Sequence, residues 1–168
     1  MKFGNIPDMS LWSQSIGGLI INFGVAEFLT LRCIEVIKGE SEAIRIRKKR
    51  LSDRITIAKE AIEESSLSEE KKKESNEIWD EISKLSKKRN RIAHNPLVQG
   101  IDSNTDELVF SVIDLDRMTP NGKNVLEPLH YSEISTIALR VREITRRLST
   151  IIETIPSDQN PRAQQGGI

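Results

Sequence analysis

Four stretches of the chain repeat apolar residues at the three- and four-residue spacing of an amphipathic α-helix. The predicted helices run from Ser10 to about Lys38, from Ser41 to about Glu64, from about Ser68 to Asn95, and from Ser132 to about Ile155. Serines are favoured N-cap residues, and Gly39, Pro96 and Pro156 are suitable stop signals after three of these stretches. The chain is therefore predicted to be mainly α-helical.

A different period lies between the third and fourth predicted helices. Apolar and polar residues alternate around Phe110 and Val112, which is typical of a β-strand. Asn121 and Gly122 follow, and this dipeptide is a strong signal for a tight turn. We therefore expect a small β-hairpin over about residues 106–128, inserted before the last helix.

Composition favours one compact domain. The chain has 168 residues, of which 37% are hydrophobic and 30% charged, so it can bury a core of ordinary size. We place this domain over residues 1–156. Residues 157–168 are rich in Pro, Gly, Gln and Asn and offer little to bury, so we expect them to form a disordered tail.

The sequence also favours a soluble, cytoplasmic protein. Its single cysteine, Cys33, cannot form an internal disulfide, and its apolar helical surroundings predict a buried, inert thiol in a reducing compartment. The N-terminus shows no charged leader followed by a clean apolar segment. Several polar residues interrupt the uncharged run from Met9 to Ala26, so we expect a buried helix there and no membrane contact.

Arg89 interrupts an apolar row on the third predicted helix. That row consists of Ile78, Ile82, Leu85, Arg89 and Ile92. The first predicted helix has a similar row, which consists of Ile16, Ile20, Phe23, Glu27, Thr30, Ile34 and Ile37. A guanidinium on an apolar face needs a counter-charge or an anionic ligand. We therefore predict that Glu27 neighbours Arg89, either as a structural ion pair or as part of a functional site.

Two further polar residues lie beside Arg89. Asn90 and His94 are four residues apart and share one helix face, and Arg89 projects about 100° away from Asn90. These groups suit RNA cleavage in which the ribose 2′-hydroxyl attacks the adjacent phosphorus. Arginine can bind phosphate oxygens, and asparagine can orient the phosphate or the imidazole. A histidine at the negative end of a helix dipole is favoured as an imidazolium, which can act as a general acid.

The run Arg89-Asn90-Arg91-Ile92-Ala93-His94 resembles the motif of HEPN domains, which is an arginine, a polar residue that is often asparagine, and a histidine after a short fixed gap. The resemblance also covers the order of the long paired helices, with the motif near the end of the third, and it excludes the tail. It implies an up-and-down bundle of four long helices that often forms a homodimer. Two motifs then surround one cleft, where RNA is cleaved without a metal or cofactor.

The same resemblance leaves more than one function open. Many HEPN domains act as toxins or in defence against phage, where a cognate antitoxin is an expected partner, and others are noncatalytic binding modules or partners of nucleotidyltransferases. The sequence therefore supports two hypotheses. The first is an endoribonuclease that uses Arg89, Asn90 and His94, with Glu27 in support. The second is a helical interaction module in which these residues only organise an interface.

Acid–base cleavage normally needs two groups that transfer protons, and the chain has only two histidines. A two-fold homodimer would supply a second copy of His94. The alternative is His130, whose position just before the last predicted helix is typical of a helix-start residue. We therefore leave His130 outside the predicted site.

Cations cluster in two segments although the formal net charge is zero. Lys87, Lys88 and Arg91 flank the motif, and Arg47 and Arg50 belong to a basic run on the second predicted helix. They are candidates for binding an RNA backbone, and a solvated helix face balanced by glutamates is the alternative. Only 4% of the residues are aromatic, so base stacking on aromatic rings is expected to be minor.

The sequence shows no pattern for a metal or a nucleotide cofactor. One cysteine and two distant histidines do not match a zinc site, and no glycine-rich phosphate loop follows a strand. Asp114 and Asp116 are better explained as a charged strand end than as a metal site.

Overall fold

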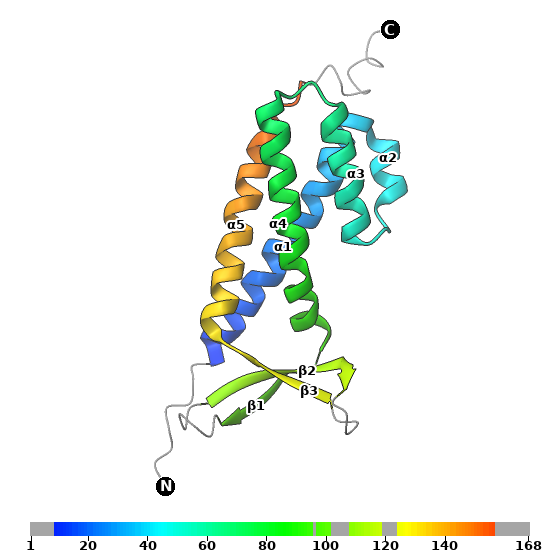
Figure 1. Ribbon diagram of the computed structural model, residues 1–168. Coiled ribbons are helices and arrows are strands. Elements are labelled where there is room, and N and C mark those ends of the chain that lie inside the picture. Colours follow the sequence, from blue (N-terminus) through cyan, green and yellow to red (C-terminus); the bar gives the residue numbers. More distant parts are fainter. Residues whose placement is uncertain (1–8, 96, 102–107, 119–123, 157–168) are drawn as a thin grey trace. The chain divides into compact units, whose positions relative to one another are not determined.

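The computed structural model describes residues 9–95, 97–101, 108–118 and 124–156. Its elements are α1 (Met9–Lys38), α2 (Glu40–Ile46), α3 (Leu51–Glu64), α4 (Glu69–His94), β1 (Leu97–Ile101), β2 (Leu108–Met118), β3 (Asn124–Leu129) and α5 (Tyr131–Glu153). Within the described residues the strands make one antiparallel sheet in the order β1-β2-β3 (Figure 1). The predicted fold, mainly helical with a small β insertion before the last helix, is confirmed.

The second predicted helix is two helices in the structure. Gly39 has a φ of 95°, a left-handed conformation that favours glycine, and it separates α1 from α2. Four consecutive cations, residues 47–50, lie between α2 and α3. A continued helix would hold Arg47 and Arg50, which are three residues apart, on one face, and this is unfavourable for like charges. The chain reverses there, and α2 and α3 run in opposite directions (Figure 1).

β1 is a strand that the periodicity did not predict. Its residues pair antiparallel with β2, from Leu97 opposite Val112 to Ile101 opposite Leu108. A strand of five residues that includes a glycine is too short to show a clear alternation of apolar and polar positions. The pairing with β2 therefore decides its conformation.

The predicted hairpin corresponds to β2 and β3. These strands pair antiparallel with Phe110 opposite Leu129, and Pro128 lies opposite Ser111. Proline has no N–H to donate, and β3 is an edge strand of this sheet, where a proline is tolerated. The turn predicted at Asn121-Gly122 lies outside the described residues.

The chain divides into two compact units, each made of separate segments. The sheet unit comprises Met1–Ile21 and Ser86–Arg140, and the helical unit comprises Asn22–Leu85 and Val141–Ile168. α1, α4 and α5 each contribute residues to both units. One domain over residues 1–156 stays a prediction, and the predicted tail at 157–168 lies outside the described residues.

Three aromatic side chains pack together in the sheet unit. The centroid of the Trp12 ring on α1 lies 4.5 Å from that of Phe110 on β2 and 5.8 Å from that of Tyr131 on α5. Tilted and edge-on aromatic pairs contribute about 0.5–1.5 kcal/mol beyond the burial of their area. These contacts hold the beginning of α1 against the sheet and the start of α5.

The helical unit buries the apolar rows of its helices. Phe23 and Ile34 of the predicted α1 row are fully buried, and so is Ile82 of the α4 row. Trp79, next to that row, is also buried. Although α1 is long and mostly apolar, none of the helices in the described residues meets the length and hydropathy needed to cross a membrane.

Cys33 on α1 is fully buried, and its burial raises the pKa of the thiol to about 12. Because the thiolate is the reactive form, we predict that the native protein resists iodoacetamide at mildly alkaline pH and that the urea-unfolded protein is labelled. Mass spectrometry of the labelled fraction measures this. Equal labelling of both states would contradict the prediction.

The buried thiol also affects stability. The unfolded thiol ionises near its ordinary pKa of 9.0, so the free energy of unfolding should fall as pH rises from 9.0 toward 12.

Candidate functional site

The three motif residues lie on the last two turns of α4. The helix ends at His94, two residues before Pro96 in the sequence. The residue that precedes a proline, here Asn95, resists helical geometry. The side chain of Asn95 donates from Nδ2 to the carbonyl oxygen of Arg91 at 3.0 Å. This bond satisfies one of the carbonyls that a helix C-terminus leaves without an intrahelical donor. The last turn, which carries His94, is thus held by a side-chain cap.

The motif side chains differ in their access to solvent. Asn90 and His94 are exposed, and their four-residue separation places them on one face of α4. Arg89 is half-buried, and its Nε atom is fully buried. The structure therefore presents an amide and an imidazole on one accessible face, with a partly sheltered guanidinium beside them, all within the sheet unit.

Glu27 forms an ion pair that the sequence reasoning did not predict. Its Oε2 lies 3.1 Å from Nη2 of Arg54 on α3, and both residues belong to the helical unit. The Arg54 side chain is only 8% exposed and that of Glu27 35%. Arg89 lies in the sheet unit, so its predicted proximity to Glu27 stays a prediction.

A signal for the Arg54 pair was present in the sequence. Arg54 precedes Ala58 and Ala61 at helical spacing, and all three are buried on the same side of α3. Two alanines leave room for a neighbouring helix to approach, so an arginine continuing their row is placed on the packed face. A run of basic residues precedes Arg54 in the sequence, so the sequence analysis did not separate the buried Arg54 from its exposed neighbours.

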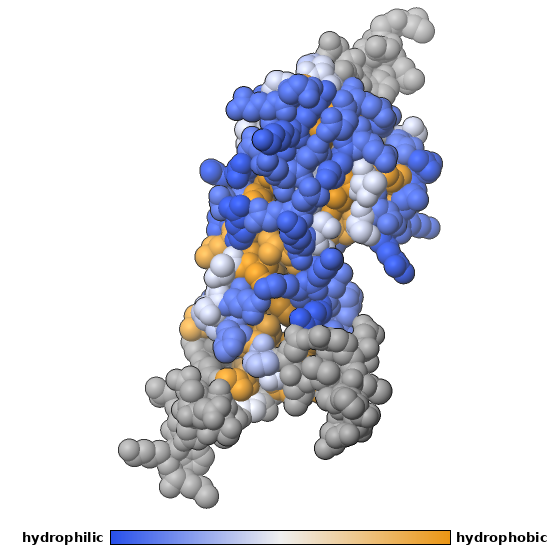
Figure 2. Space-filling view, in the orientation of Figure 1, coloured by the Kyte–Doolittle hydropathy of each residue, from blue (hydrophilic) through white to orange (hydrophobic). Residues whose placement is uncertain are grey.

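The predicted RNA-backbone cations fall into two groups. Lys87 and Lys88 are exposed and Arg91 is half-buried at the end of α4, in the sheet unit. Arg47 and Arg50 are exposed between α2 and α3, in the helical unit. The visible face of α2 and α3 is mostly hydrophilic (Figure 2). Each group presents positive charge to solvent, and binding of RNA to either stays a prediction.

Lys88 has a specific counter-charge. Its Nζ lies 2.5 Å from Oε1 of Glu133, which is in the first turn of α5. The sequence reasoning missed Glu133 because it is 45 residues away along the chain. Only the packing of α5 beside the end of α4 within the sheet unit brings the two together.

His130 has the role expected of a helix-start residue. Its carbonyl oxygen accepts hydrogen bonds from the backbone N–H groups of Glu133 and Ile134, at 3.0 and 3.3 Å. These bonds close the first turn of α5. The interpretation of His130 as a residue that begins the last helix is confirmed.

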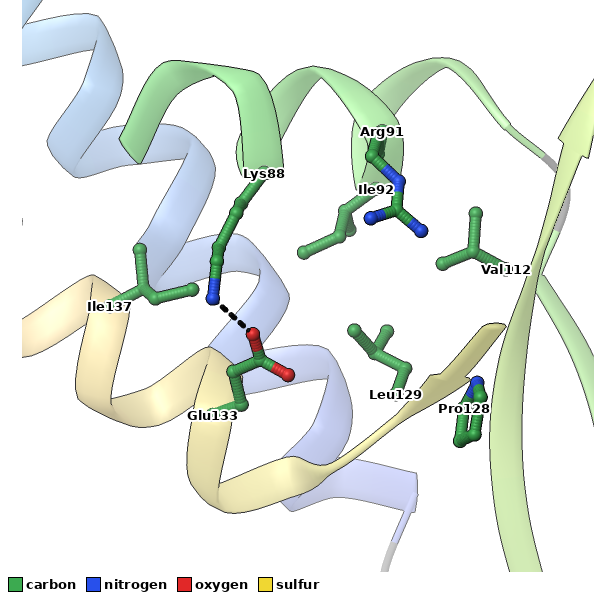
Figure 3. Close-up of a pocket in the computed structure, with 8 residues that line it drawn as sticks. All are labelled: Lys88, Arg91, Ile92, Val112, Pro128, Leu129, Glu133 and Ile137. Carbon is green, nitrogen blue, oxygen red and sulfur yellow. Dashed lines mark hydrogen bonds and ion pairs between the residues drawn. The ribbon is translucent and has the colours of Figure 1, made fainter. Parts of the chain in front are cut away.

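A pocket of about 80 Å³ lies beside the motif turns, between the end of α4, the strands β2 and β3, and the start of α5 (Figure 3). All of its lining residues belong to the sheet unit. Lys88 and Arg91 line it from α4, and Glu133 faces them from α5. The remaining wall is mostly aliphatic. Two of the predicted RNA-backbone cations therefore border a defined hollow.

The described residues were also compared with the arrangement that a metal ion needs. Among residues 9–95, 97–101, 108–118 and 124–156, no group of three or more His, Cys, Asp or Glu side chains is placed to hold a metal ion. Asp114 and Asp116 lie within β2, which ends at Met118, and their interpretation as a charged strand end stays a prediction.

Comparison with known proteins gave no match. No model of a protein family fits the chain, and neither the curated proteins nor the solved structures that were searched contain a similar one.

Proposed function

We propose that this protein is a metal-independent endoribonuclease of the HEPN type. The observation that carries the proposal is the exposure of Asn90 and His94 on one face of α4, with the half-buried Arg89 beside them. The three side chains supply an amide, an imidazole and a guanidinium. The imidazole can transfer a proton and the guanidinium can stabilise developing negative charge, which are two needs of a phosphoryl transfer without a metal.

In the proposed reaction the ribose 2′-oxygen attacks the adjacent phosphorus and the bond from phosphorus to the 5′-oxygen breaks. His94 donates a proton to the departing 5′-oxygen, and the dipole of α4 supports a positive charge on its imidazole. Arg89 stabilises the charge that develops on the phosphate oxygens. Asn90 orients the phosphate by donating from its amide. The products are a 2′,3′-cyclic phosphate and a 5′-hydroxyl.

The proposal includes a homodimer, because a second proton-transfer group must remove the proton from the 2′-hydroxyl. The motif itself contains one histidine, and His130, the other histidine of the chain, precedes α5 outside the motif. A second copy of the chain would bring another His94 to the same cleft.

The biological setting that we propose follows from the resemblance of the motif to that of HEPN domains. A cytoplasmic ribonuclease of this type would act as a toxin or as an effector of phage defence. A cognate antitoxin or a nucleotidyltransferase would be its partner. Inspection of the neighbouring genes tests this part of the proposal without any biochemistry.

The chemical test uses RNA that lacks one 2′-hydroxyl. We expect the purified protein to cleave a single-stranded RNA in the presence of EDTA and to leave 2′,3′-cyclic phosphate ends, because the attacking group is the ribose oxygen. Replacing the ribose at the cleaved position with deoxyribose should abolish cleavage there, since the nucleophile is gone. Mass spectrometry of the fragments measures both results.

The control for this test is a second RNA with deoxyribose at a position that is not cleaved. It should be cut as fast as the all-ribose RNA. Cleavage that EDTA abolishes, or that leaves 3′-hydroxyl and 5′-phosphate ends, would contradict the mechanism, because those results indicate a metal-activated water as the nucleophile.

A helical interaction module is the second candidate function. An open hollow of about 430 Å³ in the helical unit supports it. Phe28 on its border is 62% exposed, and Val25 on the same helix is 43% exposed. Large apolar side chains in this position are typical of a surface that binds another protein. A module of this kind does not need the chemistry of the three motif residues. The His94→Ala variant therefore distinguishes the module from the nuclease.

A further inference from the structure

The pocket beside the motif has an aliphatic floor and a charged rim. Its floor consists of Ile92, Val112, Leu129 and Ile137, each between 2% and 8% exposed. Lys88 and Glu133 meet at one side of the mouth, and Arg91 extends its guanidinium toward the centre (Figure 3). Small-molecule sites combine an apolar wall with a few convergent polar groups, and they usually enclose about 300–1,000 Å³, so this smaller hollow can receive one edge of a base. Its volume of about 80 Å³ exceeds what a single bound water needs.

The ion pair at the rim offers a donor directly beside two acceptors. Lys88 donates from Nζ to Oε1 of Glu133, and a carboxylate has lone pairs on both oxygens with which to accept further hydrogen bonds. The Watson–Crick edge of guanine presents the complementary order, which is the O6 acceptor followed by the N1–H and N2–H donors. Cytosine and uracil lack two adjacent donors, and adenine offers one donor beside an acceptor. Guanine is therefore the base that matches this pair.

Arg91 supplies the flat surface that the pocket otherwise lacks. None of the eight residues that line the pocket is aromatic. Protein sites for unstacked RNA bases use either aromatic rings or the plane of an arginine guanidinium. The guanidinium of Arg91 points into the hollow opposite Leu129, so a base held there would lie against it (Figure 3).

The pocket and the motif share the same turns of α4. Lys88 precedes Arg89 directly, and Arg91 lies three residues before His94, which places it on an adjacent part of the helix surface. We propose that this pocket binds a guanine base of the RNA, next to the nucleotide whose phosphate meets His94. This assignment rests on the proposed function for its substrate, and the pocket itself can be tested without any cleavage.

The binding test uses the full-length protein and the four nucleoside 5′-monophosphates, none of which has a bond that the proposed reaction can cleave. We expect GMP to shift the methyl NMR signals of Ile92 and Ile137, which lie in the pocket floor. AMP, CMP and UMP should bind about tenfold more weakly or worse, because an unmatched hydrogen bond to a charged group costs that much. Inorganic phosphate should leave both signals unchanged.

The variant that tests recognition is Glu133→Gln. It keeps the size of the side chain and replaces one acceptor oxygen with a donor, so affinity for GMP should fall about tenfold or more. Glu143→Gln on the same helix is the matched control, because Glu143 is exposed and does not line the pocket. Its affinity for GMP should equal that of the wild type. Circular dichroism checks that both variants keep the helical fold.

Two outcomes would overturn the guanine pocket. The first is an absence of shifts with millimolar GMP, and the second is an equal response to all four nucleotides. The ribonuclease proposal fails separately, through the tests of cleavage. If GMP binds in a way that depends on Glu133 but RNA is not cleaved, the guanine pocket is supported and the ribonuclease proposal is contradicted. If RNA is cleaved with no preference for a neighbouring guanosine and GMP does not bind, the ribonuclease proposal is supported and the guanine pocket is contradicted.

Discussion

The His94→Ala variant is expected to cleave RNA about 10²- to 10⁴-fold more slowly than the wild type, the range that a positioned proton donor or acceptor contributes. The loss should be in the rate of the chemical step. His94 is exposed at the end of α4 and contributes little to the core, so the fold should persist. Single-turnover rates on a labelled RNA, with thermal unfolding measured in parallel, give both quantities.

His130→Ala is the matched control for that measurement. His130 is also an exposed histidine at a helix end, and its structural role uses the backbone carbonyl, which the substitution keeps. Its cleavage rate should equal that of the wild type. A folded His94→Ala protein that cleaves at the wild-type rate would refute the nuclease mechanism and favour the interaction module.

The Glu27→Ala variant is expected to lose about 1–3 kcal/mol of unfolding free energy, the usual cost of leaving a buried donor without its acceptor. The Arg54 side chain is 8% exposed and its Nε is buried without a hydrogen bond, whereas the Glu27 side chain is 35% exposed, so water can replace the carboxylate only in part. Urea denaturation monitored by circular dichroism measures the change. Replacing Glu27 and Arg54 together by residues of similar size without charge should recover part of the loss.

Glu35→Ala is the matched control for Glu27→Ala. Both glutamates are on α1, and both ion pairs have an N–O distance of 3.1 Å. Arg32, which pairs with Glu35, has 44% of its side chain exposed. Exposed pairs contribute about 0–1 kcal/mol, so this variant should lose little. Similar losses for Glu27→Ala and Glu35→Ala would show that burial of Arg54 is not what makes its pair important.

Local periodicity predicted the long helices and the place of the motif. Apolar residues at helical spacing locate α1, α4 and α5 to within a few residues of their observed ends. The proline after Asn95 ends α4 near His94. Spacing along one helix also places Asn90 and His94 on a common face. These features depend on neighbours in sequence, which is why they can be read from the sequence alone.

Contacts between distant segments decided the rest. The five-residue strand β1 forms because β2 lies beside it. Glu27 pairs with Arg54, and Lys88 pairs with Glu133 at the rim of the pocket. A periodic pattern shows which face of an element is apolar, and it does not specify which other element covers that face. The sequence therefore determined the helices and the motif, and only the tertiary structure decided which charges meet and where the pocket lies.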